Sequence, residues 1–170
     1  MEFKETMLSR KSCREFTDQA VEAEKLEKVI TAASMAPLGM PKAGKPHLTV
    51  VTNKDMLKTL GGLAGPERGD IIYGAPVLII VSCPVTAPGL AEMNAACVVE
   101  MMSLAATDLG LGNIYLYGVT AALQHNDALK AELGIPENCI PQSALALGYG
   151  TEHVTVCKAF TKTLTENRID

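Results

Sequence analysis

The pattern of apolar and polar positions predicts helices and strands that are interleaved along the chain. Between Glu22 and Ser34, apolar residues recur every three or four positions, so that Leu26, Val29 and Ile30 share one helical face. Further helices are predicted at Phe3–Ser9, Lys54–Leu60, Ala91–Leu109 and Asn126–Leu133. Short apolar runs predict strands at His47–Thr52, Val77–Cys83, Asn113–Gly118 and Ser143–Gly148. This order favours an α+β fold, with helices packed on a small central sheet.

The segment Ala91–Leu109 is apolar on nearly all sides, and Gly110 and Gly112 mark its end. A helix of this kind must be buried all round. It is therefore either the central helix of the domain or a helix shared with a second subunit. Three methionines in this region are interpreted as packing residues rather than ligand contacts: Met93, Met101 and Met102.

Composition sets limits on the class of protein. The 170 residues predict one domain, 1–170, with a polar C-terminal tail from about 151 to 170. With 48% hydrophobic and 20% charged residues, the chain is too apolar for a disordered protein. The formal charge of −4, the lack of a Lys/Arg block and the scarcity of aromatic residues argue against a nucleic-acid partner. A mean hydropathy of +0.17 fits a buried subunit interface, although a well-filled core would explain it too.

Membrane and metal sites are also unexpected. No apolar run reaches the length of a membrane span, and the start of the chain does not resemble a signal peptide. The five cysteines are scattered, and neither they nor the three histidines have metal-ligand spacing. Reduced cysteines in a chain without a secretory signal indicate a cytoplasmic protein.

The main candidate for chemistry is a basic cluster near the N-terminus. Arg10, Lys11, Ser12 and Arg14 offer three cations and a hydroxyl, a donor set suited to phosphate. Alone, such a cluster is more often a solvated surface. Cys13 lies between cations that lower a thiol pKa, but its isolation favours a structural role. Because the chain contains no catalytic triad, phosphate loop or zinc motif, a cofactor is expected to carry the chemistry.

Several segments together resemble the FMN-dependent nitroreductase family. They occur in the family's order and cover nearly the whole chain. The matching segments are SRKSCREFTDQAV, EAEKLEKVITAASMAP, YGAPVLIIVSC, NAACVVEMMSLAATDLGLGNIYLYG and LGIPENCIPQSALALGYG. The resemblance implies a nitroreductase-like α+β fold with a buried central helix, and an intertwined homodimer with FMN at its interface.

The resemblance also implies which residues contact FMN. The opening cluster supplies Arg10, Ser12 and Arg14, with Lys11 beside them. Two later segments would lie near the flavin ring: Pro37, Leu38, Gly39 and Met40, and the stretch Tyr115, Leu116, Tyr117 and Gly118. In the tail, Lys158 and Lys162 are the candidates for closing over the phosphate. No side chain is assigned a firm catalytic role, although Tyr117 is a candidate proton donor.

The implied reaction passes a hydride from NADH or NADPH through FMN to a nitroaromatic, a quinone or a similar small acceptor. Two features depart from the family pattern. The loop Leu38–Pro41 lacks the usual Asn and resembles a variant PMGIPP branch, and the bridge Pro84–Gly89 is short. The substrate class therefore stays open. Alternatives are a reductive dehalogenase or flavin-degrading relative of the same fold, a non-catalytic flavin-binding or small-molecule-binding dimer, and a thiol redox protein that uses Cys13.

Overall fold

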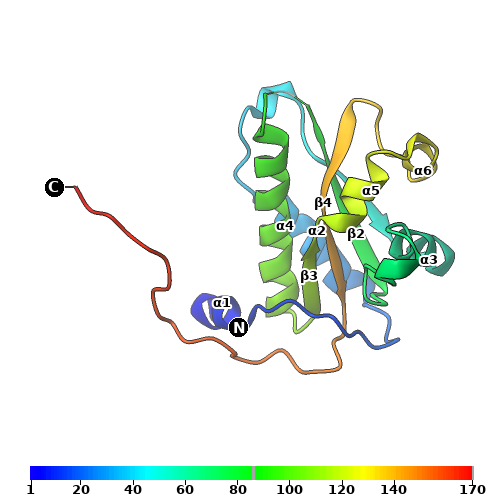
Figure 1. The fold of residues 1–170 in the computed structure, drawn as a ribbon. Helices are drawn as coiled ribbons and strands as arrows, with labels where there is room; N and C mark the ends of the chain where they lie inside the picture. The colour runs from blue at the N-terminus through cyan, green and yellow to red at the C-terminus, as the bar shows by residue number, and fades with distance from the viewer. Residues whose placement is uncertain (86, 170) are drawn as a thin grey trace.

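A four-stranded antiparallel sheet forms the centre of the computed structural model, which describes residues 1–85 and 87–169. The spatial order of the strands is β1-β2-β4-β3 (Figure 1). The strands are β1 (His47–Val51), β2 (Val77–Pro84), β3 (Gly112–Leu116) and β4 (Cys139–Gly148). β2 is buried along its length apart from Pro84, as expected for an apolar run in a central strand.

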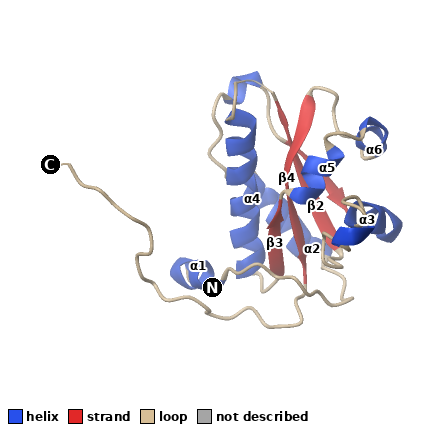
Figure 2. Cartoon of the chain, in the orientation of Figure 1, coloured by secondary structure: helices blue, strands red, loops and turns tan. Residues whose placement is uncertain are grey.

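Helices cover both faces of the sheet (Figure 2). On one face lie α2 (Ala23–Ala33) and α4 (Leu90–Asp108), which pack on Val77, Ile79 and Val81 of β2. The other face carries α3 (Lys54–Gly61), α5 (Gly118–Leu123) and α6 (Asp127–Glu132), which pack around Leu78 and Ile80. The remaining helix, α1 (Phe3–Ser9), lies against α4. Two short 3₁₀ turns occur at Pro41–Ala43 and Pro66–Arg68. The predicted α+β fold is thus confirmed.

The predicted helices and strands are all present, and the largest differences lie around β3 and β4. β3 ends at Leu116, two residues earlier than predicted, because Tyr117 adopts helical angles and leads directly into α5. The sequence pattern did not reveal α5, whose six residues are too few for a helical period. The strand predicted at Ser143 begins at Cys139 and pairs with β2 from its first residue.

One side of α4 is buried, and the other is exposed in the single chain. Val98, Val99 and Met102 pack against the sheet. Met93, by contrast, is 65% exposed, so it does not pack in the core of the single chain. The helix has no strong polar face because apolar residues occupy both sides. It is therefore central to the subunit while also presenting an apolar surface.

A buried asparagine joins the end of α4 to β3. Asn113 accepts a hydrogen bond from the Ser103 hydroxyl at 2.7 Å. Its side-chain amide donates to the Thr107 hydroxyl at 3.0 Å and to the Ser103 carbonyl at 3.2 Å. All three residues are at least 97% buried. A polar network of this kind stabilises a core only when its members are paired, as they are here.

Beyond Gly150 the chain leaves the sheet and runs along the base of the molecule as an extended tail (Figure 1). Nearly every side chain from Thr151 to Ile169 is exposed. Asp170, the end of the tail predicted from the sequence, and Thr86, in the predicted bridge, lie outside the described residues.

The start of α3 allows a test of helix capping. Asn53 accepts a hydrogen bond from the Met56 backbone amide at 3.0 Å and is the N-cap of this helix. We expect Asn53→Ala to lower the free energy of unfolding by about 1 kcal/mol. Asp55→Ala, the matched control, should cost clearly less. Urea denaturation of both variants checks this, and a larger loss for Asp55→Ala would contradict the assignment.

The Asn113 network gives a second prediction. Asn113→Ala removes the partner of a buried Ser103 hydroxyl, so we expect a loss of about 2–3 kcal/mol in unfolding free energy. Asn138→Ala, at an exposed position, should change it by less than about 0.5 kcal/mol. Denaturant titrations followed by circular dichroism measure both. Equal effects at the two positions would show that the network does not stabilise the fold.

Candidate functional site

The basic cluster lies in an extended segment that adds to the edge of the sheet. α1 ends at Ser9, and the backbone of Arg10 is extended. Ser12 then forms a parallel bridge with Asn113 of β3, and the Cys13 amide donates to the Asn113 carbonyl at 2.9 Å. An edge strand such as β3 leaves backbone N–H and C=O groups unpaired, and the cluster segment forms hydrogen bonds with some of them. The sheet thereby fixes the position of the cations.

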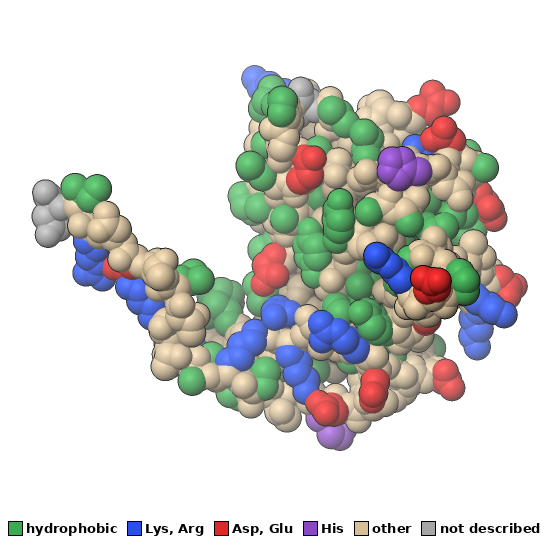
Figure 3. Space-filling model, viewed as in Figure 1, with side chains coloured by type: hydrophobic (Ala, Val, Ile, Leu, Met, Phe, Trp, Pro, Cys, Tyr) green, Lys and Arg blue, Asp and Glu red, His purple; other side chains and the backbone are tan. Residues whose placement is uncertain are grey.

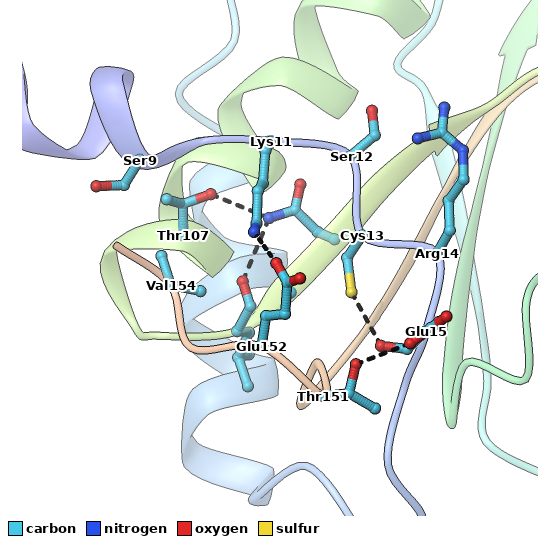
Figure 4. Close-up of a pocket in the computed structure, with 13 residues that line it drawn as sticks. Ser9, Lys11, Ser12, Cys13, Arg14, Glu15, Thr107, Thr151, Glu152 and Val154 are labelled. Atoms are coloured by element: carbon cyan, nitrogen blue, oxygen red, sulfur yellow. Dashed lines mark hydrogen bonds and ion pairs between the residues drawn. The ribbon is translucent and has the colours of Figure 1, made fainter. Parts of the chain in front are cut away.

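Side chains along this segment point alternately to two sides. Figure 4 shows Lys11 and Cys13 directed toward the start of the C-terminal tail, with Ser12 and Arg14 on the other side. This is the period of two expected of an extended chain. The cluster therefore presents side chains on two sides, although its residues are contiguous in sequence.

A cavity of about 250 Å³ lies at this segment. Its walls come from the cluster segment, from Thr107 and Asn113 at the junction of α4 and β3, and from Thr151 and Glu152 at the start of the tail. Lys11, Ser12 and Arg14 all line it. The fold thus brings three of the predicted cofactor residues to one cavity.

The cations differ in their partners. Lys11 Nζ forms an ion pair with the Glu152 carboxylate, and their hydrogen bond raises the pKa of Lys11 and lowers that of Glu152. Within residues 1–85 and 87–169, Arg10 and Arg14 have no carboxylate within ion-pair distance. The arginines are free to bind an anion, whereas Lys11 has its charge balanced. Figure 3 shows Lys and Arg side chains gathered near the base of the molecule, beside the start of the tail.

Ser9 and Cys13 complete the cavity in different ways. The Ser9 hydroxyl is buried without a hydrogen-bond partner, and Ser9 is one of the lining residues. By contrast, the Cys13 thiol packs closely against two glycines: a Cβ on Gly112 would lie 2.8 Å from its sulfur, and one on Gly150 would lie 3.0 Å away. Cys13 therefore has a packing role between β3 and the end of β4.

The predicted flavin loop lies elsewhere, against the first turns of α4. The Gly39 amide donates to the Asn94 side chain at 2.9 Å, and Asn94 donates back to the Gly39 carbonyl at 3.2 Å. Met40 adopts a left-handed conformation (φ 49°) and is 57% exposed. Pro37 and Leu38 precede these residues, and none of the four lines the cavity beside Lys11.

The remaining candidates do not line that cavity either. Tyr115 is partly exposed and hydrogen-bonds to Ser143, while Leu116 is buried. Tyr117 is 66% exposed at the start of α5, next to Gly118. In the tail, Lys158 and Lys162 are exposed, and Lys162 forms an ion pair with Glu166. In a single chain, the predicted cofactor residues therefore occupy several separate places.

Sequence reasoning missed several residues of the cavity, among them Ser9, Thr107, Asn113 and Glu152. Asn113 could have been noticed in the sequence, because a polar amide inside an otherwise apolar strand requires hydrogen-bond partners. Glu152 gave no such signal, since it is one acidic residue in a polar tail. Only the folded chain brings it to Lys11.

The part of the chain that the structure describes offers neither a metal site nor a membrane-spanning helix. There, no group of three or more His, Cys, Asp or Glu side chains could hold a metal ion. Nor is any described helix long and apolar enough to span a membrane. Burial raises the pKa of the Cys83 thiol to about 12, which makes it a poor nucleophile.

Comparisons with known proteins give a consistent result. A relative from Methanothermobacter thermautotrophicus, which carries the provisional name NADH dehydrogenase/NAD(P)H nitroreductase, is 31% identical over 90% of this chain and 80% of its own. The crystal structure of a Bacteroides fragilis nitroreductase with bound FMN superposes with a TM-score of 0.84, at 27% identity and full coverage of both chains. A Desulfitobacterium hafniense nitroreductase with bound FMN gives a TM-score of 0.82, at 27% identity and 99% coverage of both chains.

The model of the nitroreductase family matches residues 7–149, from the last part of α1 to the residue after β4. This range contains the extended basic segment, the loop on α4 and the strand that anchors Ser12. The chain belongs to the nitroreductase family.

Proposed function

We propose that this protein is an FMN-dependent oxidoreductase that uses NADH or NADPH to reduce a nitroaromatic, a quinone or a similar small acceptor. The observation that carries the proposal is the basic segment, held against β3, in which Arg10 and Arg14 have no carboxylate partner among the described residues. Relatives of the same fold and length have been solved with bound FMN. When bound, FMN supplies the redox chemistry by taking a hydride from the nicotinamide and giving electrons to the acceptor.

The cavity fits a flavin phosphate or ribityl chain. Arg14 can donate several hydrogen bonds to an anion, and Ser12 adds a neutral donor. The buried Ser9 hydroxyl has no partner within the described chain, so a polar ligand atom would satisfy it. We assign binding of the anionic end of FMN to Arg10, Ser12 and Arg14.

The two other predicted segments would contact the flavin ring. The loop Pro37–Met40 is held rigidly by the paired hydrogen bonds with Asn94, which suits a surface that a planar ring must meet. Tyr115–Gly118 would supply backbone groups, since its amides depend little on side-chain identity. Protons for the acceptor would come from solvent or from the exposed Tyr117.

We further propose that two subunits complete the site. Along α4, apolar side chains reach the surface at Met93, Cys97, Met101 and Leu104, which lie on one side of the helix. Figure 3 shows hydrophobic side chains at the surface over α4. A second copy packed here would bury this surface and bring the separated candidate residues of two chains together.

The tail fits the same arrangement. From 151 to 169 it carries apolar side chains that are at least 53% exposed, at Val156, Phe160, Leu164 and Ile169. We propose that residues 1–170 form one FMN-binding domain whose tail packs on, or exchanges with, the partner subunit. Lys158 and Lys162 would then close over a phosphate. Five free cysteines support a cytoplasmic location.

The decisive experiment for this function is spectroscopic. Protein supplemented with FMN should show flavin absorption bands that bleach with NADH or NADPH under anaerobic conditions. The bands should return when a nitroaromatic or a quinone is added. Bound flavin that never bleaches would favour a non-catalytic binding protein, and failure to bind FMN would reject the proposal.

The role of the arginines can be measured separately. Arg10→Ala should weaken FMN binding by about tenfold to a hundredfold, since a charged hydrogen bond contributes about 1.5–3 kcal/mol. Arg68→Ala, in the exposed turn Pro66–Arg68, is the matched control and should have no effect. Flavin fluorescence quenching gives the dissociation constants. Unchanged binding by Arg10→Ala would refute the assignment of the cluster.

The α4 surface predicts the oligomeric state. The native protein should sediment as a dimer, and Met101→Asp should shift it toward monomer because a carboxylate would enter an apolar interface. Tyr73→Asp introduces the same charge at an exposed turn near α3 and should leave the dimer intact. A dimer that resists Met101→Asp would place the interface elsewhere.

A further inference from the structure

The C-terminal tail follows the N-terminal segment in the opposite direction. Three contacts join residues in reverse order along the two segments: the Thr151 amide to the Glu15 carbonyl at 3.2 Å, the Cys157 amide to the Leu8 carbonyl at 3.1 Å, and the Phe160 ring to Lys4 Nζ at 4.6 Å. The tail therefore lies along the segment that carries the predicted cofactor residues.

One ion pair strengthens this alignment. Among the described residues, Lys11–Glu152 is the sole ion pair between the tail and the rest of the chain. Next to it, the Thr151 hydroxyl donates to the Glu15 carboxylate at 3.2 Å. The tail is thus fixed at its start, directly beside the cavity.

The alternation of side chains separates Lys11 from the other cluster residues. Figure 4 shows Lys11 reaching toward Glu152, whereas Ser12 and Arg14 point to the opposite side of the segment. Arg10 stands two residues before Ser12 in the chain, and it does not line the cavity. Lys11 also lines the cavity, but its ammonium is bonded to Glu152, so it would have to leave that carboxylate to bind a ligand.

We propose that Lys11 and Glu152 form a clasp that sets the course of the tail, so that Lys11 is a positioning residue rather than a group that binds FMN. The inference rests on the proposed flavin-binding function. It assigns direct binding to Arg10, Ser12 and Arg14 alone. The sequence had placed Lys11 among the FMN contacts because of its position in the cluster.

The clasp matters because of what the tail carries. Lys158 follows directly after Cys157, and among the described residues it has no carboxylate within ion-pair distance. Holding the tail at Glu152 and again at Cys157 restricts Lys158 to a small region, which raises its effective concentration at the site. An exposed ion pair contributes little alone, so the clasp works together with its neighbouring contacts.

A charge swap tests the proposal. Lys11→Glu and Glu152→Lys each break the clasp, and the double variant restores an ion pair with reversed polarity. We expect each single variant to raise the FMN dissociation constant by about threefold to tenfold. The double variant should return to within about twofold of the native protein. Hydrogen exchange of the Cys157 amide, measured without flavin, should be faster in the single variants than in the native protein. In the double variant the exchange rate should return to the native value.

Glu152→Lys distinguishes the two roles of Lys11. It adds positive charge, so simple attraction would tighten FMN binding, whereas loss of the clasp weakens it. If Lys11 binds the phosphate directly, Lys11→Glu and the double variant would both place a carboxylate against that phosphate, and FMN binding would not recover in the double variant. Either result would overturn the proposal.

Controls separate the clasp from the proposed function. Lys28 and Glu24 form an exposed pair on α2 at 2.7 Å, and Lys28→Glu should change neither FMN binding nor exchange of the Cys157 amide. If the native protein does not bind FMN, the proposed function fails. The hydrogen-exchange measurement would still show whether Lys11 and Glu152 hold the tail.

Discussion

The arrangement of the candidate site depends on the two-sided bonding of Asn113. Its backbone carbonyl holds Cys13, and the bridge beside it holds Ser12, while its side chain is bonded to Ser103 and Thr107 of α4. The extended basic segment, the edge strand and the long helix therefore meet at one buried amide. Because each of these groups would be costly to bury unpaired, the network stabilises the observed relative position of the three. The position of the cations is therefore set by this buried network.

The charges at the site differ from the net charge of the chain: the chain carries a formal charge of −4, whereas the site contains a cluster of cations. Lys11 is balanced by Glu152, whereas Arg10 and Arg14 have no carboxylate partner among the described residues. An unpaired guanidinium at a small cavity is suited to an external anion. The same five-residue segment thus combines an internal ion pair with open anion donors. Strand geometry permits this combination, because neighbouring side chains face opposite ways.

The long helix α4 links the fold to the proposed assembly. Its inward residues fill the core beside β2 and β4, and its outward side presents Met93 and other apolar groups. Such a helix has no preferred polar side, so the single chain leaves apolar surface exposed. In the proposed dimer, a second copy would cover this surface and bring together Tyr117, Met40 and the basic segment. On this view the subunit is a folded unit whose site is completed by its partner.

The sequence alone predicts the helices with clear periodicity, the central strand at Val77–Cys83 and the basic cluster. Each of these features depends on residues that are adjacent in the sequence. Family motifs added the expectation of a flavin. The short helix α5 could not be found this way, since six residues carry no period and Tyr117 ends β3 through its backbone angles. Nor could the pairing of Lys11 with Glu152 be predicted, because 141 positions separate them and neither neighbourhood signals the other. Such long-range contacts exist only once the sheet and α4 have brought the two ends of the chain together.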